Sequence, residues 1–217
     1  VSFAVDKQSI TLITGENGAG KTTLFNLITG LEKPTKGIIT FNGINITGKS
    51  ALEIAKYGII RLYQQPRLFK NLLVWENLVS AAQQNAGYSL FNLIFRGKTA
   101  KQEDENLKKK AIALLAKFNL QDLCNHQAGE LSYGQQKLIS FCMIIMNGAQ
   151  LALLDEPFAG LNPKTIDKFS TMILQMKSEG ITFLIIEHNI NKVLKIADSQ
   201  IEMKDGNIKT INDVLVA

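Results

Sequence analysis

The sequence has 217 residues, of which 46% are apolar and 20% charged, and its formal net charge is +5. This length allows one large domain or two small ones, and the apolar share is ordinary for a globular protein. No apolar run approaches the roughly 20 residues that span a bilayer. The net positive charge comes in part from short lysine-rich stretches, which are typical of solvated helix faces. The composition therefore favours neither a membrane-spanning protein nor a nucleic-acid partner.

The first predicted elements flank a glycine-rich stretch. Residues 1–5 alternate apolar and polar side chains, which predicts an edge strand, and residues 10–14 indicate a buried strand. Residues 24–28 then indicate a helix that ends at Gly30. Residues 15–23 therefore lie at a strand–loop–helix junction.

This junction reads Gly-Glu-Asn-Gly-Ala-Gly-Lys-Thr-Thr and fits the phosphate-loop pattern G-x-x-x-x-G-K-[ST]. Glycines let the backbone amides turn inward as an anion nest, and the helix that begins near Lys21 adds the positive end of its dipole. Lys21 would reach the β- and γ-phosphates, and the Thr22 hydroxyl would bind Mg²⁺. The alternative is a glycine-rich turn that binds nothing, but the flanking strand and helix argue against it. We expect nucleotide contacts along the whole loop, from Gly15, Glu16, Asn17, Gly18, Ala19, Gly20, Lys21, Thr22 and Thr23.

A hairpin and a strand follow. Residues 38–46 contain two short apolar stretches around Asn42-Gly43, a pair that favours tight hairpin turns. Residues 58–63 predict a short apolar strand, which delivers Gln64 to a proline-containing loop.

The next part of the chain predicts helices. Residues 72–86 look helical, and the looser pattern of residues 87–106 indicates an inserted, mostly helical segment. Beyond it, apolar side chains recur at helical spacing and must face a core, namely Leu107, Ala111, Leu114, Leu115 and Phe118.

The last third alternates helices with apolar strands. Ser132 and Gln135 fit a capping box at a helix start, and Asn162-Pro163 begins a helix whose apolar stripe is Ile166, Phe169, Ile173 and Met176. Residues 150–154 and 181–186 are continuous apolar strands, and Asp205-Gly206 joins two short strands. This alternation predicts a parallel α/β sheet that binds its ligand at the carboxyl ends of the strands.

The strand at 150–154 delivers two adjacent carboxylates, Asp155 and Glu156. Asp155 can hold Mg²⁺, directly or through water, and Glu156 can polarise an attacking water. An acidic turn at a strand end is the alternative. A phosphate loop upstream makes that alternative weaker, because the two features are components of one phosphoryl-transfer site.

Leu131-Ser132-Tyr133-Gly134-Gln135 resembles the signature motif of ATP-binding cassette (ABC) ATPases. Six motifs follow one another in that family's order across nearly the whole chain: the phosphate loop, Gln64, the signature, Asp155-Glu156, Ala159-Gly160-Leu161-Asn162 and His188. Each motif alone is modest support, but their joint order identifies the chain as a member of the ABC ATPases.

The resemblance implies an α/β P-loop NTPase fold with a parallel core sheet, an antiparallel β subdomain and a helical subdomain. Residues 1–217 would form a single ABC ATPase domain, with the helical subdomain at about 70–147 inserted in a RecA-like core. It further implies a cytoplasmic ATP hydrolase that uses Mg²⁺ and is peripheral on the inner face of the cell membrane. Its partners would be transmembrane permease subunits, a second identical or paralogous ATPase subunit and, indirectly, a substrate-binding protein.

The resemblance also assigns roles to individual residues. The catalytic set would be Lys21, Gln64, Glu156 and His188, and the metal would be held by Thr22, Gln64 and Asp155. Ser132, Gly134 and Gln135 would contact the nucleotide bound to the other subunit, and Asn162 would contact that subunit. Without the resemblance, Gln64 is an ordinary loop glutamine and His188 a structural histidine.

The sequence is more closely similar to the ATPase subunits of branched-chain amino-acid importers. Related urea and amide importers share the same features, and lipopolysaccharide-export ATPases share some of them. It rests on Tyr63-Gln64-Gln65-Pro66-Arg67-Leu68-Phe69, the insert, the signature and Ala159-Gly160-Leu161-Asn162-Pro163. Substrate choice resides in other polypeptides.

The sequence departs from the family pattern in three places. Tyr133 replaces the usual second glycine of the signature, and Asn162 stands where many members have aspartate. Only 14 residues precede Gly15, so either the strand that carries an adenine-stacking aromatic residue lies upstream of Val1 or another group holds the adenine.

Two other functions compete with a transport ATPase. One is an ABC ATPase without a permease, of the cluster-assembly or DNA-associated kind. The other is a small-molecule P-loop kinase, which leaves the signature and His188 unexplained.

Overall fold

The computed structural model of the chain describes residues 1–82, 98–188 and 190–213, with side chains for all of these except 98–104 and 210–213. The chain divides into two compact units, and each is described by itself. The first comprises residues 1–64 and 149–217, and the second residues 65–148.

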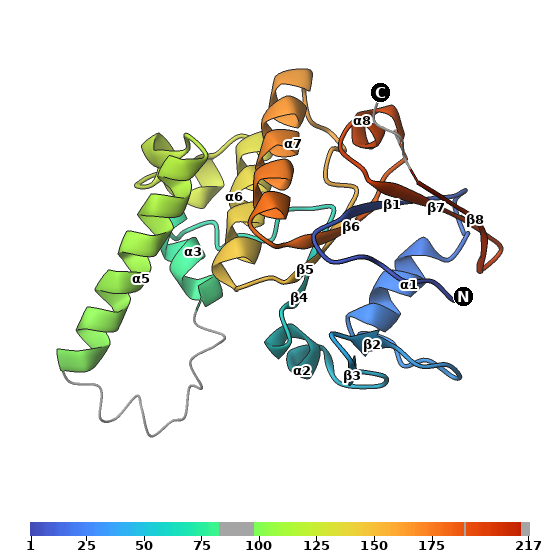
Figure 1. Cartoon of the computed structure of the whole chain (residues 1–217). Coiled ribbons are helices and arrows are strands. Elements are labelled where there is room, and N and C mark those ends of the chain that lie inside the picture. The colour runs from blue at the N-terminus through green and yellow to red at the C-terminus, as the bar shows by residue number, and fades with distance from the viewer. Residues whose placement is uncertain (83–97, 189, 214–217) are drawn as a thin grey trace. The chain divides into compact units, whose positions relative to one another are not determined.

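The first unit is built on a six-stranded sheet in the order β4-β5-β6-β1-β7-β8 (Figure 1). Its neighbouring strands pair in parallel from β4 to β7, and β8 is antiparallel to β7. The strands are β1 Ile10–Thr14, β4 Ile59–Leu62, β5 Leu151–Asp155, β6 Thr182–Ile186, β7 Ser199–Lys204 and β8 Asn207–Asp213. The predicted parallel α/β sheet is confirmed, together with an antiparallel pair at one edge.

Both faces of this sheet are covered, because its central strands are buried at every position. Helices α1 and α7 lie on opposite faces (Figure 1). The helices of this unit are α1 Lys21–Ile28, α2 Ala51–Lys56, α7 Pro163–Ser178 and α8 Ile190–Leu194. The apolar stripe predicted for α7 is buried in full. A parallel sheet covered on both faces leaves the carboxyl ends of its strands to carry a ligand site.

The predicted hairpin is a separate two-stranded sheet of β2 Thr40–Phe41 and β3 Ile44–Asn45. Asn42 and Gly43 have φ values of 49° and 79°, as the type I′ turn of a two-residue hairpin requires. The prediction of a hairpin over residues 38–46 is therefore confirmed.

The prediction of an edge strand at residues 1–5 is wrong. Among the described residues no strand pairs with this segment; its side chains Phe3 and Val5 instead pack against the apolar cluster around α1. Alternation alone predicts a strand only where a partner strand completes the ladder.

The second unit consists of helices. They are α3 Val74–Ala82, α5 Lys98–Lys117 and α6 Tyr133–Met146, with 3₁₀ turns at Gln121–Leu123 and Ala128–Glu130. The stripe predicted for α5 is buried at Ala111, Leu114, Leu115 and Phe118. Residues 83–97, which include the end of the helix predicted at 72–86 and most of the predicted insert, lie outside the described residues. No helix in the described ranges has both the length and the apolar character needed to cross a membrane.

Candidate nucleotide and hydrolysis site

The phosphate loop connects β1 to α1 and is tightly built. A Cβ atom on Gly15 would lie 2.3 Å from the carbonyl oxygen of Met203 on β7, so no larger residue fits there. Gly18 has a φ of 83°, a conformation that glycine adopts without strain, and a Cβ there would meet open space. The loop is thus pressed against β7 at one end and open at its tip.

Lys21 begins α1, and the residue is only 7% exposed. Its Nζ donates hydrogen bonds to the carbonyl oxygens of Gly15, at 2.6 Å, and Glu16, at 2.9 Å. Gly20 at the N-cap supplies no side-chain hydrogen bond to α1, so the first amides of the helix are available to an anion. Thr22 and Thr23, in the first turn, are exposed.

Asp155 is the last residue of β5. Its Oδ2 accepts a hydrogen bond of 2.5 Å from Nη2 of Arg61 on β4, and the exposed fractions of the two side chains are 15% and 6%. Among the described residues no hydrogen bond reaches its other oxygen, Oδ1. This carboxylate is therefore fixed on one side and available on the other.

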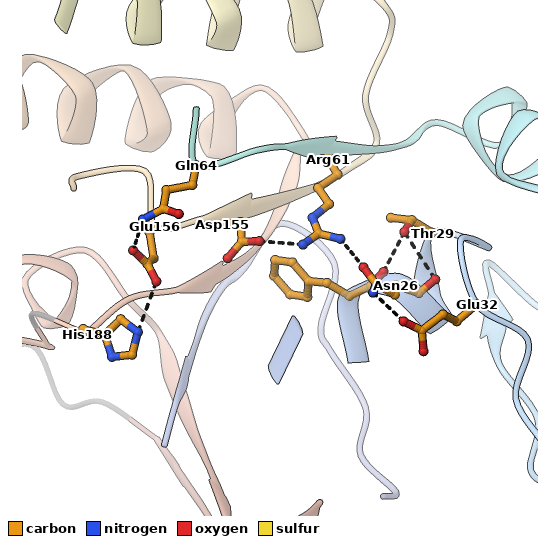
Figure 2. Close-up of polar contacts among 9 residues, drawn as sticks. Asn26, Thr29, Glu32, Arg61, Gln64, Asp155, Glu156 and His188 are labelled. Carbon is orange, nitrogen blue, oxygen red and sulfur yellow. Dashed lines mark hydrogen bonds and ion pairs between the residues drawn. The ribbon is translucent and has the colours of Figure 1, made fainter. Parts of the chain in front are cut away.

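Glu156 follows directly and has a φ of 47°, which is unusual for a residue other than glycine. Both of its carboxylate oxygens have partners (Figure 2). Gln64 Nε2 donates to Oε2 at 2.6 Å, and His188 Nε2 lies 3.1 Å from Oε1. The Glu156 side chain is 24% exposed, so solvent reaches the carboxylate that these residues hold. Strained backbone of this kind is found at functional sites.

The sheet topology explains how these groups meet. Gln64, Glu156 and His188 follow the carboxyl ends of β4, β5 and β6, which are adjacent strands, and the phosphate loop follows β1, the next one. Four segments far apart in the sequence therefore meet at one edge of the first unit.

The signature residues lie at the start of α6, in the second unit. Ser132 Oγ accepts from the Gln135 backbone amide at 3.3 Å, and Gln135 Oε1 accepts from the Ser132 amide at 2.8 Å. The predicted capping box is confirmed, and Gly134 lies in the first turn that it closes. The nucleotide contacts expected of these three residues remain a prediction.

Three residues of the first unit that hold site residues or the adjoining loop in place were not predicted from the sequence. Arg61 is a lone charge within an apolar strand, and that contrast could have drawn attention to it. Asn26 on α1 bonds to Arg61. Glu187 is 5% exposed, and its Oε1 accepts from the Phe158 amide at 2.7 Å, which orders the loop that follows Glu156.

The oxygen donors present suit Mg²⁺. This ion prefers oxygen ligands and is usually bound by one or two carboxylates together with substrate phosphates and water. Thr22 is exposed, and among the described residues one Asp155 oxygen has no partner. No cluster of three or more His, Cys, Asp or Glu residues occurs in the described part of the chain. The residues therefore fit an ion shared with nucleotide phosphates better than an all-protein site.

Comparison with known proteins agrees with this geometry. The profile described as "ABC transporter" matches residues 1–159. The "Probable branched-chain amino acid transport ATP-binding protein LivG" of Methanocaldococcus jannaschii is 39% identical over 208 residues, which cover 96% of this chain and 80% of that protein. The high-affinity branched-chain amino acid transport ATP-binding protein BraF of Pseudomonas aeruginosa is 34% identical over 207 residues, or 95% of this chain and 81% of the relative.

Solved structures give the same result. A nucleotide-free ATP-binding cassette from an ABC transporter superposes with a TM-score of 0.84 at 38% identity and covers 99% of this chain and 84% of its own. The ADP conformation of an ABC transporter cassette gives the same TM-score and identity over 98% and 83%. The predicted ABC ATPase fold is confirmed, and a transport ATPase is favoured over the non-transport alternatives. The chain belongs to the ABC transporter family, as a nucleotide-binding subunit that hydrolyses ATP.

Proposed function

We propose that this subunit energises an importer of branched-chain amino acids or of related amides or urea. It would act on the inner face of the cell membrane, bound to permease subunits that receive their substrate from a binding protein. The observation that carries the hydrolytic part is the Glu156 carboxylate, held on one oxygen by Gln64 and on the other by His188. The names of the relatives support the transported class.

Binding of ATP starts at the phosphate loop. The Lys21 ammonium lies among carbonyl oxygens of its own loop, and a triphosphate would offer it stronger, charged acceptors. Lys21 would turn from these carbonyls to the β- and γ-phosphates, while amides along residues 15–23 bind the remaining oxygens.

Thr22, Asp155 and Gln64 would hold Mg²⁺, which neutralises charge on the β- and γ-phosphates when bound. Asp155 would face the metal through Oδ1, because Arg61 occupies Oδ2. Thr22 would contribute its hydroxyl from the first turn of α1.

Glu156 would accept a hydrogen bond from the attacking water and so orient it toward the γ-phosphate. Gln64 and His188 fix the carboxylate in place, and His188 would also hydrogen-bond the γ-phosphate. The Gln64 contact would be sensitive to the permease, since this residue precedes the loop that leads into the second unit.

The remaining residues of the ATP site would come from another copy of the subunit or from a paralogue. Its α6 begins with a capped N-terminus at Ser132, where a hydroxyl, the Gly134 amide and the helix dipole together favour an anion. Ser132, Gly134 and Gln135 would complete the site around the γ-phosphate, with Asn162 at the same dimer contact.

Transport is tested by reconstitution. The subunit would be assembled in proteoliposomes with the permease and binding protein of its proposed transporter, and uptake of leucine, an amide and urea measured with ATP inside. We expect ATP-dependent uptake of one of these classes, and none with Lys21→Ala. Failure of the subunit to associate with that permease, or ATP-independent uptake, would contradict the proposal.

A further inference from the structure

A buried arginine lies behind the hydrolysis site. Arg61 is the charged residue of β4, and its side chain is 6% exposed. Its guanidinium binds two partners at once (Figure 2). Nη2 donates to Asp155 Oδ2 at 2.5 Å, and Nη1 donates to Asn26 Oδ1 at 2.6 Å. One side chain thus connects the end of β5 to helix α1.

The sheet register makes this bridge possible. Arg61 pairs with Leu153 of β5, and Asp155, two residues further on, projects from the same face of the sheet. Helix α1 covers that face, as the apolar cluster that Leu153 shares with Leu24 shows. An arginine at this position is therefore placed to reach both elements.

Asn26 and Thr22 are four residues apart on α1 and so lie on one side of the helix. Thr22 and Asp155 are two of the three residues that would hold Mg²⁺, the third being Gln64. Arg61 therefore connects the helix that presents one proposed metal ligand to the carboxylate that is another.

Further contacts hold the guanidinium in place. Asn26 Nδ2 donates to Glu32 Oε1 at 2.6 Å, which directs its Oδ1 toward Arg61. The rings of Phe25 and Tyr63 flank the guanidinium, with 5.5 Å and 5.0 Å between its carbon and the ring centroids. These contacts restrict Arg61 to one orientation.

Stability alone does not explain this arrangement. A buried ion pair gains little over well-packed apolar side chains because both charges lose their hydration. Nε of Arg61 is buried without a hydrogen-bond partner among the described residues, which adds to the cost.

We propose that Arg61 is a positioning residue for the metal site. By holding Asp155 Oδ2 and tying it to α1 through Asn26, it sets the separation of Asp155 and Thr22 and leaves Oδ1 facing the ion. This inference rests on the proposed function, since it requires Mg²⁺ at Thr22 and Asp155. Outer contacts of this kind commonly change metal affinity by about 10- to 100-fold.

The test measures nucleotide binding, not turnover. A fluorescent ATP analogue is titrated into each variant with EDTA and again with Mg²⁺, and the ratio of the two affinities gives the gain due to the metal. For Arg61→Met and Arg61→Lys we expect this gain to fall about tenfold, while affinity in EDTA stays within about twofold of the unmodified chain. Asn26→Leu, which leaves the Arg61–Asp155 pair intact, should lower the gain by a smaller factor.

The direction of the effect separates positioning from simple charge. Removing a positive charge near a cation would strengthen Mg²⁺ binding, so a purely electrostatic role predicts a larger gain for Arg61→Met and no change for Arg61→Lys, which keeps the charge. A positioning role predicts a loss in both, because lysine cannot bridge two partners with a planar fork. An unchanged or larger gain in both variants would overturn the proposal.

Two controls complete the test. Lys177→Met removes another ion pair of the first unit, Lys177 with Asp198, which has the same 2.5 Å separation but is more exposed, and should leave the gain unchanged. Asp155→Asn should abolish most of the gain. If Asp155→Asn has no effect, the proposed metal site itself is wrong, whereas an effect of Asp155→Asn without one of Arg61→Lys refutes only the role of Arg61. Thermal unfolding identifies variants that fail to fold. If Arg61→Met is one of them, Asn26→Leu still tests whether the link from Arg61 to α1 affects the gain due to the metal.

Discussion

The phosphate loop holds the buried Lys21 ammonium with its own backbone. The ammonium is shielded from solvent and bonded to two carbonyl oxygens that the loop itself supplies. Neutral acceptors satisfy its hydrogen bonds but leave its charge without a counter-charge, and a phosphate supplies both.

The substitution Lys21→Ala should therefore weaken ATP binding and abolish turnover. Losing charge-assisted hydrogen bonds to the phosphates is expected to cost about 1.5–3 kcal/mol, or about 10- to 160-fold in affinity. Isothermal titration with ATP measures the first effect and phosphate release the second. Lys7→Ala, an exposed lysine outside the loop, is the control, and unchanged ATP affinity in Lys21→Ala would remove the assigned role.

Glu156 and Asp155 are neighbours with different surroundings. Asp155 faces a guanidinium, whereas Glu156 faces an amide and an imidazole. The backbone of Glu156 has a positive φ. The two side chains bind different partners, so one carboxylate can serve the metal and the other the water. Residue order predicts this division of roles, and the structure adds the different partners of the two carboxylates.

At the scale of elements, helix α7 begins in a way that the sequence predicts in detail. Asn162 is its N-cap, with Oδ1 accepting from the Thr165 amide at 2.9 Å, and Pro163 is its first residue. Asn162 thus has a local role whether or not it also contacts a second subunit.

Replacing the cap by Asn162→Ala should lower the free energy of unfolding by about 1 kcal/mol. Chemical denaturation followed by circular dichroism measures it. Thr171→Ala, an exposed change within the same helix, should be neutral or slightly stabilising, because alanine favours helices. Equal stability of Asn162→Ala and the unmodified chain would show that the cap contributes nothing.

Local elements were predictable because their signals are local. The hairpin turn at Asn42-Gly43, the capping box at Ser132 and the stripe on α5 each follow from residues a few positions apart. The edge strand predicted at residues 1–5 is wrong because the alternation of apolar and polar side chains does not show whether a partner strand is present. Arg61 was missed because its partners lie 35 and 94 positions away, and only the register of β4 on β5 brings them together.

At the scale of the whole molecule, the proposed function requires the α6 N-terminus of a second copy beside the nucleotide that the first unit binds. Ser132→Arg should then damage hydrolysis at the nucleotide bound by the partner, because a bulky cation would displace the Ser132 hydroxyl and the amides beside it. Mixed dimers, in which one subunit carries Ser132→Arg and the other Lys21→Ala, separate the two sites.

We expect these mixed dimers to keep one active site, because both mutations then fall in the same composite site, whereas dimers that carry both mutations in one subunit should lose both sites. Ser50→Arg is a matched control, since Ser50 closes a second capping box at the start of α2 and should leave turnover unchanged. Damage confined to the nucleotide bound by the mutated copy would refute the shared site.

The most direct test of the central claim, an ATP sandwiched between two copies, is the mass of Glu156→Gln in solution. This variant keeps the shape and the hydrogen-bonding capacity of the side chain but cannot polarise water as a carboxylate does, so bound ATP should persist. Size-exclusion chromatography with light scattering should give a dimer with ATP and Mg²⁺ and a monomer with ADP. A monomer at saturating ATP, or a dimer that survives the additional change Ser132→Arg, would contradict the account.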